Sequence, residues 1–269
     1  MRRLLTPATA LVAAAFLVAV AIGWLGWSLL TLPDVAPLKD ARATLTIQVR
    51  DWKGRPHPLL VGPRNRHWTP LAACSEALIK TVIVAEDSKF FSHDGIDTAA
   101  IREAAKANLE QGRYARGAST ITQQLAKNLY LSREKTLARK LKEVILARRI
   151  DDAVSKQHIL ELYLNVVELG PLVHGVGHAS RHYFGKAPSQ LGLRESSLLA
   201  AILPGPRIYD PRRNLAAVLA RADKILQRMR EGNAIEEAEY RAALAEKVEL
   251  VPLPRLAGVG GELAPARRE

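Results

Sequence analysis

The chain has 269 residues, of which 48% are hydrophobic and 25% are charged. This composition allows one buried core of up to about 200 residues with a small appended lobe, and it excludes two large independent domains. The single cysteine, Cys74, excludes an internal disulfide and a thiolate metal cluster, whereas the formal net charge of +12 favours an anionic partner, either nucleic acid, an acidic membrane surface or a phosphorylated substrate.

The first expected element is the apolar run LVAAAFLVAVAIGWLGWSLL at residues 11–30, which contains no charged residue. A helix of about 20 such residues crosses the hydrocarbon core of a bilayer. Arg2 and Arg3 precede the run, so the positive-inside tendency places the N-terminus in the cytoplasm and the chain after residue 31 outside. A cleaved signal peptide is the alternative, but its apolar part is usually shorter. A retained anchor removes nucleic acid as a partner and favours an anionic lipid or lipid-linked molecule.

The remaining chain divides into a linker and short strand region (31–66), one helical domain (67–250) and a tail (251–269) that we expect to be disordered. The segment ATLTIQVRD at 43–51 alternates in hydrophobicity and is the one convincing strand. Elsewhere the periodicity predicts a mainly α-helical fold. The expected helices cover 70–91, 97–111, 120–131, 133–150, 155–166, 174–184, 193–203, 214–231 and 235–246.

The first motif is AEDSKFFSHDGID at 85–97. On a helix over 70–91, which would begin at Thr69-Pro70, Glu86 continues the apolar stripe, so burial should raise its pKa and make it a general base. Phe90, four residues later, is expected to shield it from water, and Asp87 is expected to bond the turn at 93–95. The alternative is a helix-end carboxylate that pairs with a neighbour.

The second motif is RGASTITQQLAKNLYL at 116–131. Ser119 or Thr120 is expected to cap a helix, and Thr120 with Gln123 has the spacing of a capping box. The helix N-terminus together with Lys127 predicts a site for phosphate or pyrophosphate. The segment lacks the G-x-x-x-x-G-K-[ST] motif of ATP-binding loops, so the sequence does not predict ATP as the ligand. An ordinary capped helix with a polar surface is the alternative.

The third motif is RKLKEVILARRID at 139–151. Arg139 and Lys140 lie four and three residues before Glu143, so that carboxylate should stay ionised with a lowered pKa. Taken alone, this pattern is typical of a weak surface ion pair. Taken with Glu86, it indicates two carboxylates in unlike surroundings, the arrangement that divides acid and base roles in glycosyl chemistry.

The fourth motif, KQHILELYLNVVELG at 156–170, and the fifth, RHYFGKAPSQLGLRESSLLAAILPGPRIYDP at 181–211, predict core packing more than chemistry. In this order, however, the five stretches resemble the successive motifs of the peptidoglycan glycosyltransferases, found in class A penicillin-binding proteins and in membrane-anchored monofunctional transglycosylases. The resemblance implies a lysozyme-like helical fold with a small membrane-proximal lobe. It also implies a single-pass protein of the bacterial inner membrane, with the catalytic domain on the outer, periplasmic side. It also implies transfer of a growing lipid-linked glycan to the 4-hydroxyl of lipid II, with inversion and release of undecaprenyl pyrophosphate.

The resemblance also implies roles for individual residues. Glu86 matches the general base and Glu143 the second glutamate, which acts on the donor side. Asn165 matches the asparagine of the YLN motif, and Phe90 and His93 match positions that shape the site. The positions matching those that line the donor cleft are Ser119, Thr120, Gln123, Gln124, Lys127, Arg139 and Lys140.

Two alternatives differ in class from this expectation: a lysozyme-like lytic hydrolase, and a non-catalytic adaptor that binds acidic lipid at the membrane. The sequence requires no cofactor and leaves a divalent cation open, since no His or Cys cluster has ligand spacing. It also leaves open the product length, the stem-peptide variant, the oligomeric state and partnership with other cell-wall synthesis proteins.

Overall fold

A computed structural model describes residues 7–111, 117–132, 134 and 136–252, so the expected tail lies outside the described residues from 253 onward. The described chain is mainly helical, as predicted. The helices are α1 (Pro7–Leu30), α2 (Glu76–Glu86), α3 (Thr98–Glu110), α4 (Ile121–Tyr130), α5 (Leu137–Ala153), α6 (Lys156–Val166), α7 (Val176–Phe184), α8 (Leu193–Ile202), α9 (Leu215–Glu231) and α10 (Glu237–Ala245). The strands are β1 (Leu45–Arg50), β2 (Pro56–Val61), β3 (Glu168–Gly170) and β4 (Val173–His174).

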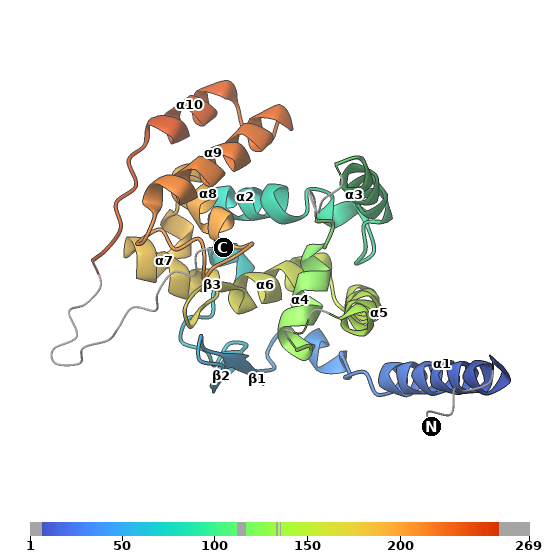
Figure 1. Ribbon diagram of the computed structural model, residues 1–269. Helices are drawn as coiled ribbons and strands as arrows, with labels where there is room; N and C mark the ends of the chain where they lie inside the picture. The colour runs from blue at the N-terminus through green and yellow to red at the C-terminus, as the bar shows by residue number, and fades with distance from the viewer. Residues whose placement is uncertain (1–6, 112–116, 133, 135, 253–269) are drawn as a thin grey trace.

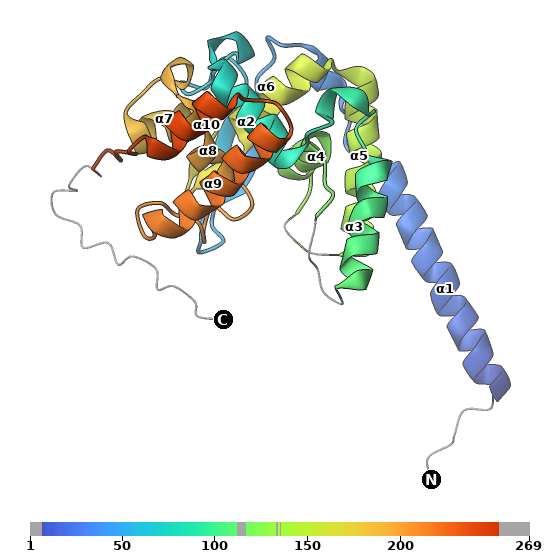
Figure 2. The same cartoon turned by 90° about the horizontal axis from the view of Figure 1, so that it is seen from above.

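The apolar run at 11–30 lies on α1, which extends away from the rest of the chain in both views (Figures 1 and 2). Among the described residues, no helix meets the length and apolarity required to cross a membrane. The expected anchor is therefore not confirmed.

The predicted strand at 43–51 is confirmed as β1, but it has an antiparallel partner, β2, that we did not predict. Pro56 and Pro58 argue against a strand because proline cannot donate to the ladder. In a two-stranded sheet both strands are edge strands, so the backbone nitrogen of a proline in β2 can face away from β1 and needs no hydrogen bond. The short pair β3 and β4 was also not predicted.

The helix expected over 70–91 is shorter than predicted. A 3-10 turn, η2 (Leu71–Ala73), occupies its beginning, and Ser75 caps α2 by accepting a hydrogen bond from the amide of Leu78. The helix ends at Glu86, and a second 3-10 turn, η3 (Phe90–Ser92), follows. Glu86 is therefore the last helical residue instead of a residue in the middle of a stripe.

The core is organised around α8, in which every residue from Arg194 to Ile202 is buried. A helix buried on all sides must lie among other elements, and α8 packs against α2, α9 and α10. The other half of the domain is built by α4, which packs against α5 and α6 (Figure 1). The C-terminal end of α2 meets this second half, and this meeting point carries the site described next.

Candidate functional site

Glu86 lies partly buried at the end of α2. Burial raises the pKa of this carboxyl group, and the hydrogen bond from Gln124 and the positive charges of Arg228, Lys127 and Arg221 oppose that rise. A carboxylate with a raised pKa is a better base than an exposed one. The expectation that Glu86 occupies a desolvated position is thus met.

The side chain of Gln124 connects Glu86 to the core. Its Nε2 donates a hydrogen bond of 2.7 Å to Oε2 of Glu86, and its Oε1 accepts one of 3.2 Å from the hydroxyl of Tyr163. The three residues belong to α4, α2 and α6. Gln124 was predicted to line the cleft, and the structure places it directly on the candidate base.

Glu143 lies in a cationic setting, as its sequence neighbours predict. The side chain is buried, with 3% of the residue exposed. It accepts a hydrogen bond of 2.7 Å from Arg139 and a second, short one from Lys140, whose ammonium group also donates to Ser119 at 2.9 Å. Buried charges need partners of this kind, so Glu143 is held in place by two cations at once.

Lys127 is electrostatically coupled to both carboxylates. Burial lowers the pKa of its ammonium group, Glu143 and Glu86 both raise it, and Arg139 and Lys140 lower it. Two acids that act on a single ammonium must both lie within electrostatic range of it. Both glutamates therefore lie within electrostatic range of Lys127.

A cavity of about 420 Å³ lies at a different place, between residues 32–35 and the end of α5. Its lining comprises Leu32, Pro33, Asp34, Val35, Arg149 and Asp152, and does not include the two glutamates. Charge and hydrogen bonding, and not this cavity, define the candidate site.

At the start of α4, where we predicted an anion site, the protein itself supplies an anionic side chain. The amide of Ile121 donates to Oδ2 of Asp87 at 3.0 Å. The expected capping box is confirmed: the amide of Gln123 donates to Oγ1 of Thr120, and the amide of Thr120 donates to Oε1 of Gln123. Thr120 and Gln123 are buried and organise the helix start, and their contact with a ligand stays a prediction.

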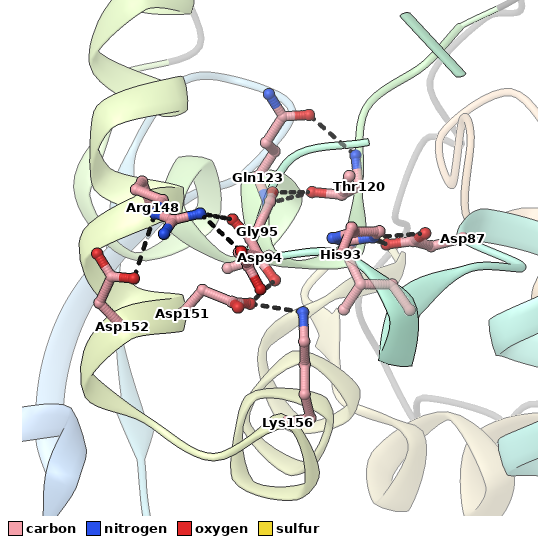
Figure 3. A network of polar contacts seen from close by, with 12 residues as sticks. Asp87, His93, Asp94, Gly95, Thr120, Gln123, Arg148, Asp151, Asp152 and Lys156 are labelled. Atoms are coloured by element: carbon pink, nitrogen blue, oxygen red, sulfur yellow. Dashed lines mark hydrogen bonds and ion pairs between the residues drawn. The ribbon is translucent and has the colours of Figure 1, made fainter. Parts of the chain in front are cut away.

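Asp87 also holds the turn that follows α2, as expected (Figure 3). Both of its carboxylate oxygens lie 3.0 Å from Nε2 of His93, and the two side chains are almost fully buried. Further along the turn, Gly95 has a φ of +79° and its carbonyl accepts a hydrogen bond from Oγ1 of Thr120. A Cβ at this glycine would lie 2.8 Å from the carbonyl oxygen of Ala147, so the turn packs directly on α5.

Charged side chains extend the same network along α5 (Figure 3). Arg148 donates to Asp94 at 3.1 Å and pairs with Asp152, whereas Lys156 donates to Asp151 at 2.7 Å. His93 thus belongs to a structural brace between the turn, α4 and α5. Its predicted role in shaping the site is indirect.

Phe90 does not have the place that a continuous helix would give it. It lies in η3, fully buried, with the ammonium group of Lys156 4.7 Å from its ring centroid and His93 at its edge. Because α2 ends at Glu86, Phe90 no longer follows it by one helical turn. The ring supports the turn, and the expected shielding of Glu86 by Phe90 stays a prediction.

Asn165 is buried and fully engaged by backbone groups. Its Oδ1 accepts from the amide of Thr69 at 2.8 Å, and its Nδ2 donates to the carbonyl oxygens of Thr69 and Glu161, each at 2.8 Å. The side chain therefore clamps the segment before α2 onto α6. These bonds give Asn165 a structural role, and its expected contact with substrate stays a prediction.

Sequence reasoning missed three residues near Glu86: Tyr163 in α6 and Arg221 and Arg228 in α9. Tyr163 carried a signal, since its hydroxyl stands on a face of otherwise apolar core residues. The two arginines carried none, because α9 follows the last recognisable motif. Within the described residues, no group of three or more His, Cys, Asp and Glu side chains is placed to hold a metal ion.

Comparison with known proteins gives one family. The family model described as transglycosylase matches residues 56–230. The chain is 44% identical over 162 residues to a biosynthetic peptidoglycan transglycosylase of Nitrosospira multiformis, an alignment that covers 60% of this chain and 70% of that protein. It is 42% identical over 234 residues to penicillin-binding protein 1A of Vibrio cholerae, covering 86% of this chain and 28% of that protein.

This chain thus spans about a quarter of the length of the penicillin-binding protein 1A relatives that it matches. A crystal structure of penicillin-binding protein 1A from Haemophilus influenzae aligns with a TM-score of 0.43 and 24% identity, covering 77% of this chain and 21% of that one.

Proposed function

The chain belongs to the transglycosylase family, and on that premise we propose that it polymerises the glycan strands of peptidoglycan. The proposed donor is a growing glycan on undecaprenyl pyrophosphate, and the proposed acceptor is lipid II. The observation that carries the proposal is the pair of glutamates that both act electrostatically on Lys127, one with a raised pKa and one ion-paired.

In the proposed reaction, Glu86 removes the proton from the 4-hydroxyl of lipid II. The hydroxyl oxygen forms a bond to C1 of the donor sugar while the bond from C1 to the pyrophosphate oxygen breaks. The electron pair leaves with the pyrophosphate, and attack from the opposite face inverts C1. The raised pKa of Glu86 supports this role, since a base works best when its pKa approaches the working pH.

Negative charge grows on the departing pyrophosphate, and we assign its stabilisation to the cations around Glu143. Lys127 reaches this region from α4, and Arg139 and Lys140 reach it from α5. Cations placed where charge develops stabilise the transition state more than the ground state. In this proposal Glu143 holds Arg139 and Lys140 in position, and Ser119 fixes the ammonium group of Lys140.

The proposed organisation follows from the same function. Residues 1–30 would form a cytoplasmic stub and inner-membrane anchor, 31–66 a connecting region, and 67–250 a lysozyme-like catalytic domain outside the cytoplasm with a small lobe near the membrane. The uncharged run at 11–30 and the net charge of +12 support this arrangement, because the substrate would be an anionic lipid in the same bilayer.

The test is a polymerisation assay with purified lipid II on the wild type, Glu86→Gln and Glu143→Gln. The wild type should lengthen glycan chains, and Glu86→Gln should reduce the rate by at least about 10²-fold, because no side chain then accepts the proton. Far-UV circular dichroism of both variants controls for folding.

The same assay separates the alternatives when finished glycan strands are supplied in a parallel reaction. Shortening of those strands without growth on lipid II would identify a lytic hydrolase. Binding of acidic lipid without either activity would identify an adaptor. Either result would refute the proposed polymerase.

A further inference from the structure

Tyr163 stands at the inner end of a hydrogen-bonded chain that runs through Gln124 to Glu86. Tyr163 is fully buried and lies 39 positions from Gln124 in the sequence. Its hydroxyl donates to Oε1 of Gln124, and Nε2 of Gln124 donates to Oε2 of Glu86. The three groups form a chain in which each hydrogen bond points toward the carboxylate.

The direction of this chain depends on the orientation of one amide. A glutamine side chain has a donor end and an acceptor end of nearly equal shape. With the donor end on Glu86, the amide stabilises the ionised carboxylate. With the acceptor end there, a carbonyl oxygen would face a carboxylate oxygen at 2.7 Å, which is tolerable only if Glu86 is protonated.

We propose that Tyr163 is a positioning residue for the catalytic base: its hydroxyl selects the orientation of Gln124 in which the amide N–H faces Glu86. Gln124 then occupies Oε2, and Oε1 is the oxygen assigned to the acceptor hydroxyl. Tyr163 touches neither substrate in this scheme and acts only through Gln124. The inference rests on the proposed function of Glu86 as a base.

The surroundings of Tyr163 keep its hydroxyl protonated. Burial raises the pKa of this phenol well above its usual range, and the nearby carboxylates of Glu86 and Asp87 raise it further. A phenol that does not ionise offers a lasting donor to Oε1 of Gln124. The charges that act on Glu86 from other elements are those of Lys127 on α4 and of Arg221 and Arg228 on α9.

Removing the hydroxyl should therefore change the titration of Glu86 in a known direction. In Tyr163→Phe, Oε1 of Gln124 loses its donor and the amide is free to turn. The ionised form of Glu86 is then less stabilised, so its pKa rises further. Activity as a base needs the ionised form, so the acidic limb of the rate profile should move to higher pH.

A matched control is available in Tyr183. It is also almost fully buried, and its hydroxyl donates to the carbonyl oxygen of Leu169 at 2.8 Å, away from Glu86. Tyr183→Phe removes the same atom from the core and should lower stability without moving the limb. Only a positional role of Tyr163 predicts a difference between the two variants.

The experiment uses the full chain in detergent with two readouts. The first is the titration of Glu86 followed by carboxylate infrared difference spectra against Glu86→Gln, without substrate. The second is the pH dependence of polymerisation of lipid II. In Tyr163→Phe, the polymerisation rate at pH values below the pKa of Glu86 should fall several-fold, up to about tenfold. At alkaline pH, where Glu86 is ionised in both proteins, the rate should approach that of the wild type.

A second variant keeps the test decisive if Tyr163→Phe folds poorly. Gln124→Met should move the Glu86 titration upward at least as far, and adding Tyr163→Phe to it should produce no further movement, because the hydroxyl acts through the amide. An unmoved titration in either variant, or an equal movement in Tyr183→Phe, overturns the inference. Failure of the wild type to polymerise lipid II would refute the proposed function, while the titration would still decide the role of Tyr163.

Discussion

Replacing Asn165 tests whether this side chain is a clamp or a ligand contact. Asn165→Ala removes three hydrogen bonds, two to Thr69 and one to Glu161. At about 1 kcal/mol net for each bond, the loss is about 3 kcal/mol. Thr69 is buried, so its unpaired amide and carbonyl add to the cost. We expect the free energy of unfolding to fall by about 4 kcal/mol.

Asn165→Asp sharpens the test because it keeps the shape. One carboxylate oxygen can still accept from the amide of Thr69, but the other would replace a donor and face two carbonyl oxygens. We expect this variant to be at least as unstable as the alanine variant. Asn214→Ala is the control: it removes a single exposed cap hydrogen bond to Ala217 and should cost only about 1 kcal/mol.

Urea unfolding of the full chain in detergent, followed by tryptophan fluorescence, measures these differences, and Trp68 adjoins the clamped residue. A loss in Asn165→Ala no larger than in Asn214→Ala would refute the reasoning, as would wild-type stability in Asn165→Asp. If Asn165 instead contacted substrate, the alanine variant would stay folded and show a raised KM.

The remaining predictions concern Glu86 and Gly177. The pKa of Glu86 is raised above its value of 4.5 in the unfolded chain, so ionisation of this side chain opposes folding. The contribution of protonated Glu86 to the free energy of unfolding is complete below pH 4.5 and is lost as the pH rises through the folded-state pKa. Glu86→Gln should therefore raise the free energy of unfolding at neutral pH by about 1 kcal/mol and lose that gain below pH 4.5. Urea titrations at both pH values measure this difference. A variant that is less stable than the wild type at neutral pH would contradict a desolvated carboxylate. Gly177→Ala would stabilise a helix with open space at this position, but here it should destabilise the protein by about 1–3 kcal/mol. The reason is that the new Cβ would lie 2.3 Å from the carbonyl oxygen of His67 and from Oγ1 of Thr69. A rise in melting temperature would show that the segment with His67 and Thr69 can move aside.

Local chemistry explains what the sequence determined by itself. The capping box of Thr120 and Gln123 and the pairing of Glu143 with Arg139 and Lys140 join residues three or four positions apart. Once a helix forms, its geometry alone brings such side chains together. The helical periodicity, the strand β1 and the bond from Asp87 to the following turn were predictable for the same reason.

The tertiary structure decided the contacts between distant segments. Gln124 meets Glu86 across 38 positions, and Asn165 meets Thr69 across 96. No periodicity encodes such pairs, because they depend on how whole helices pack. The same packing lets Asp87 fill the N-terminus of α4, which the sequence had indicated as an anion site. The two candidate acids were therefore readable from residues 85–97 and 139–151, and so were the partners of Glu143. The hydrogen-bond partner of Glu86, in contrast, was set by the meeting of α2 and α4.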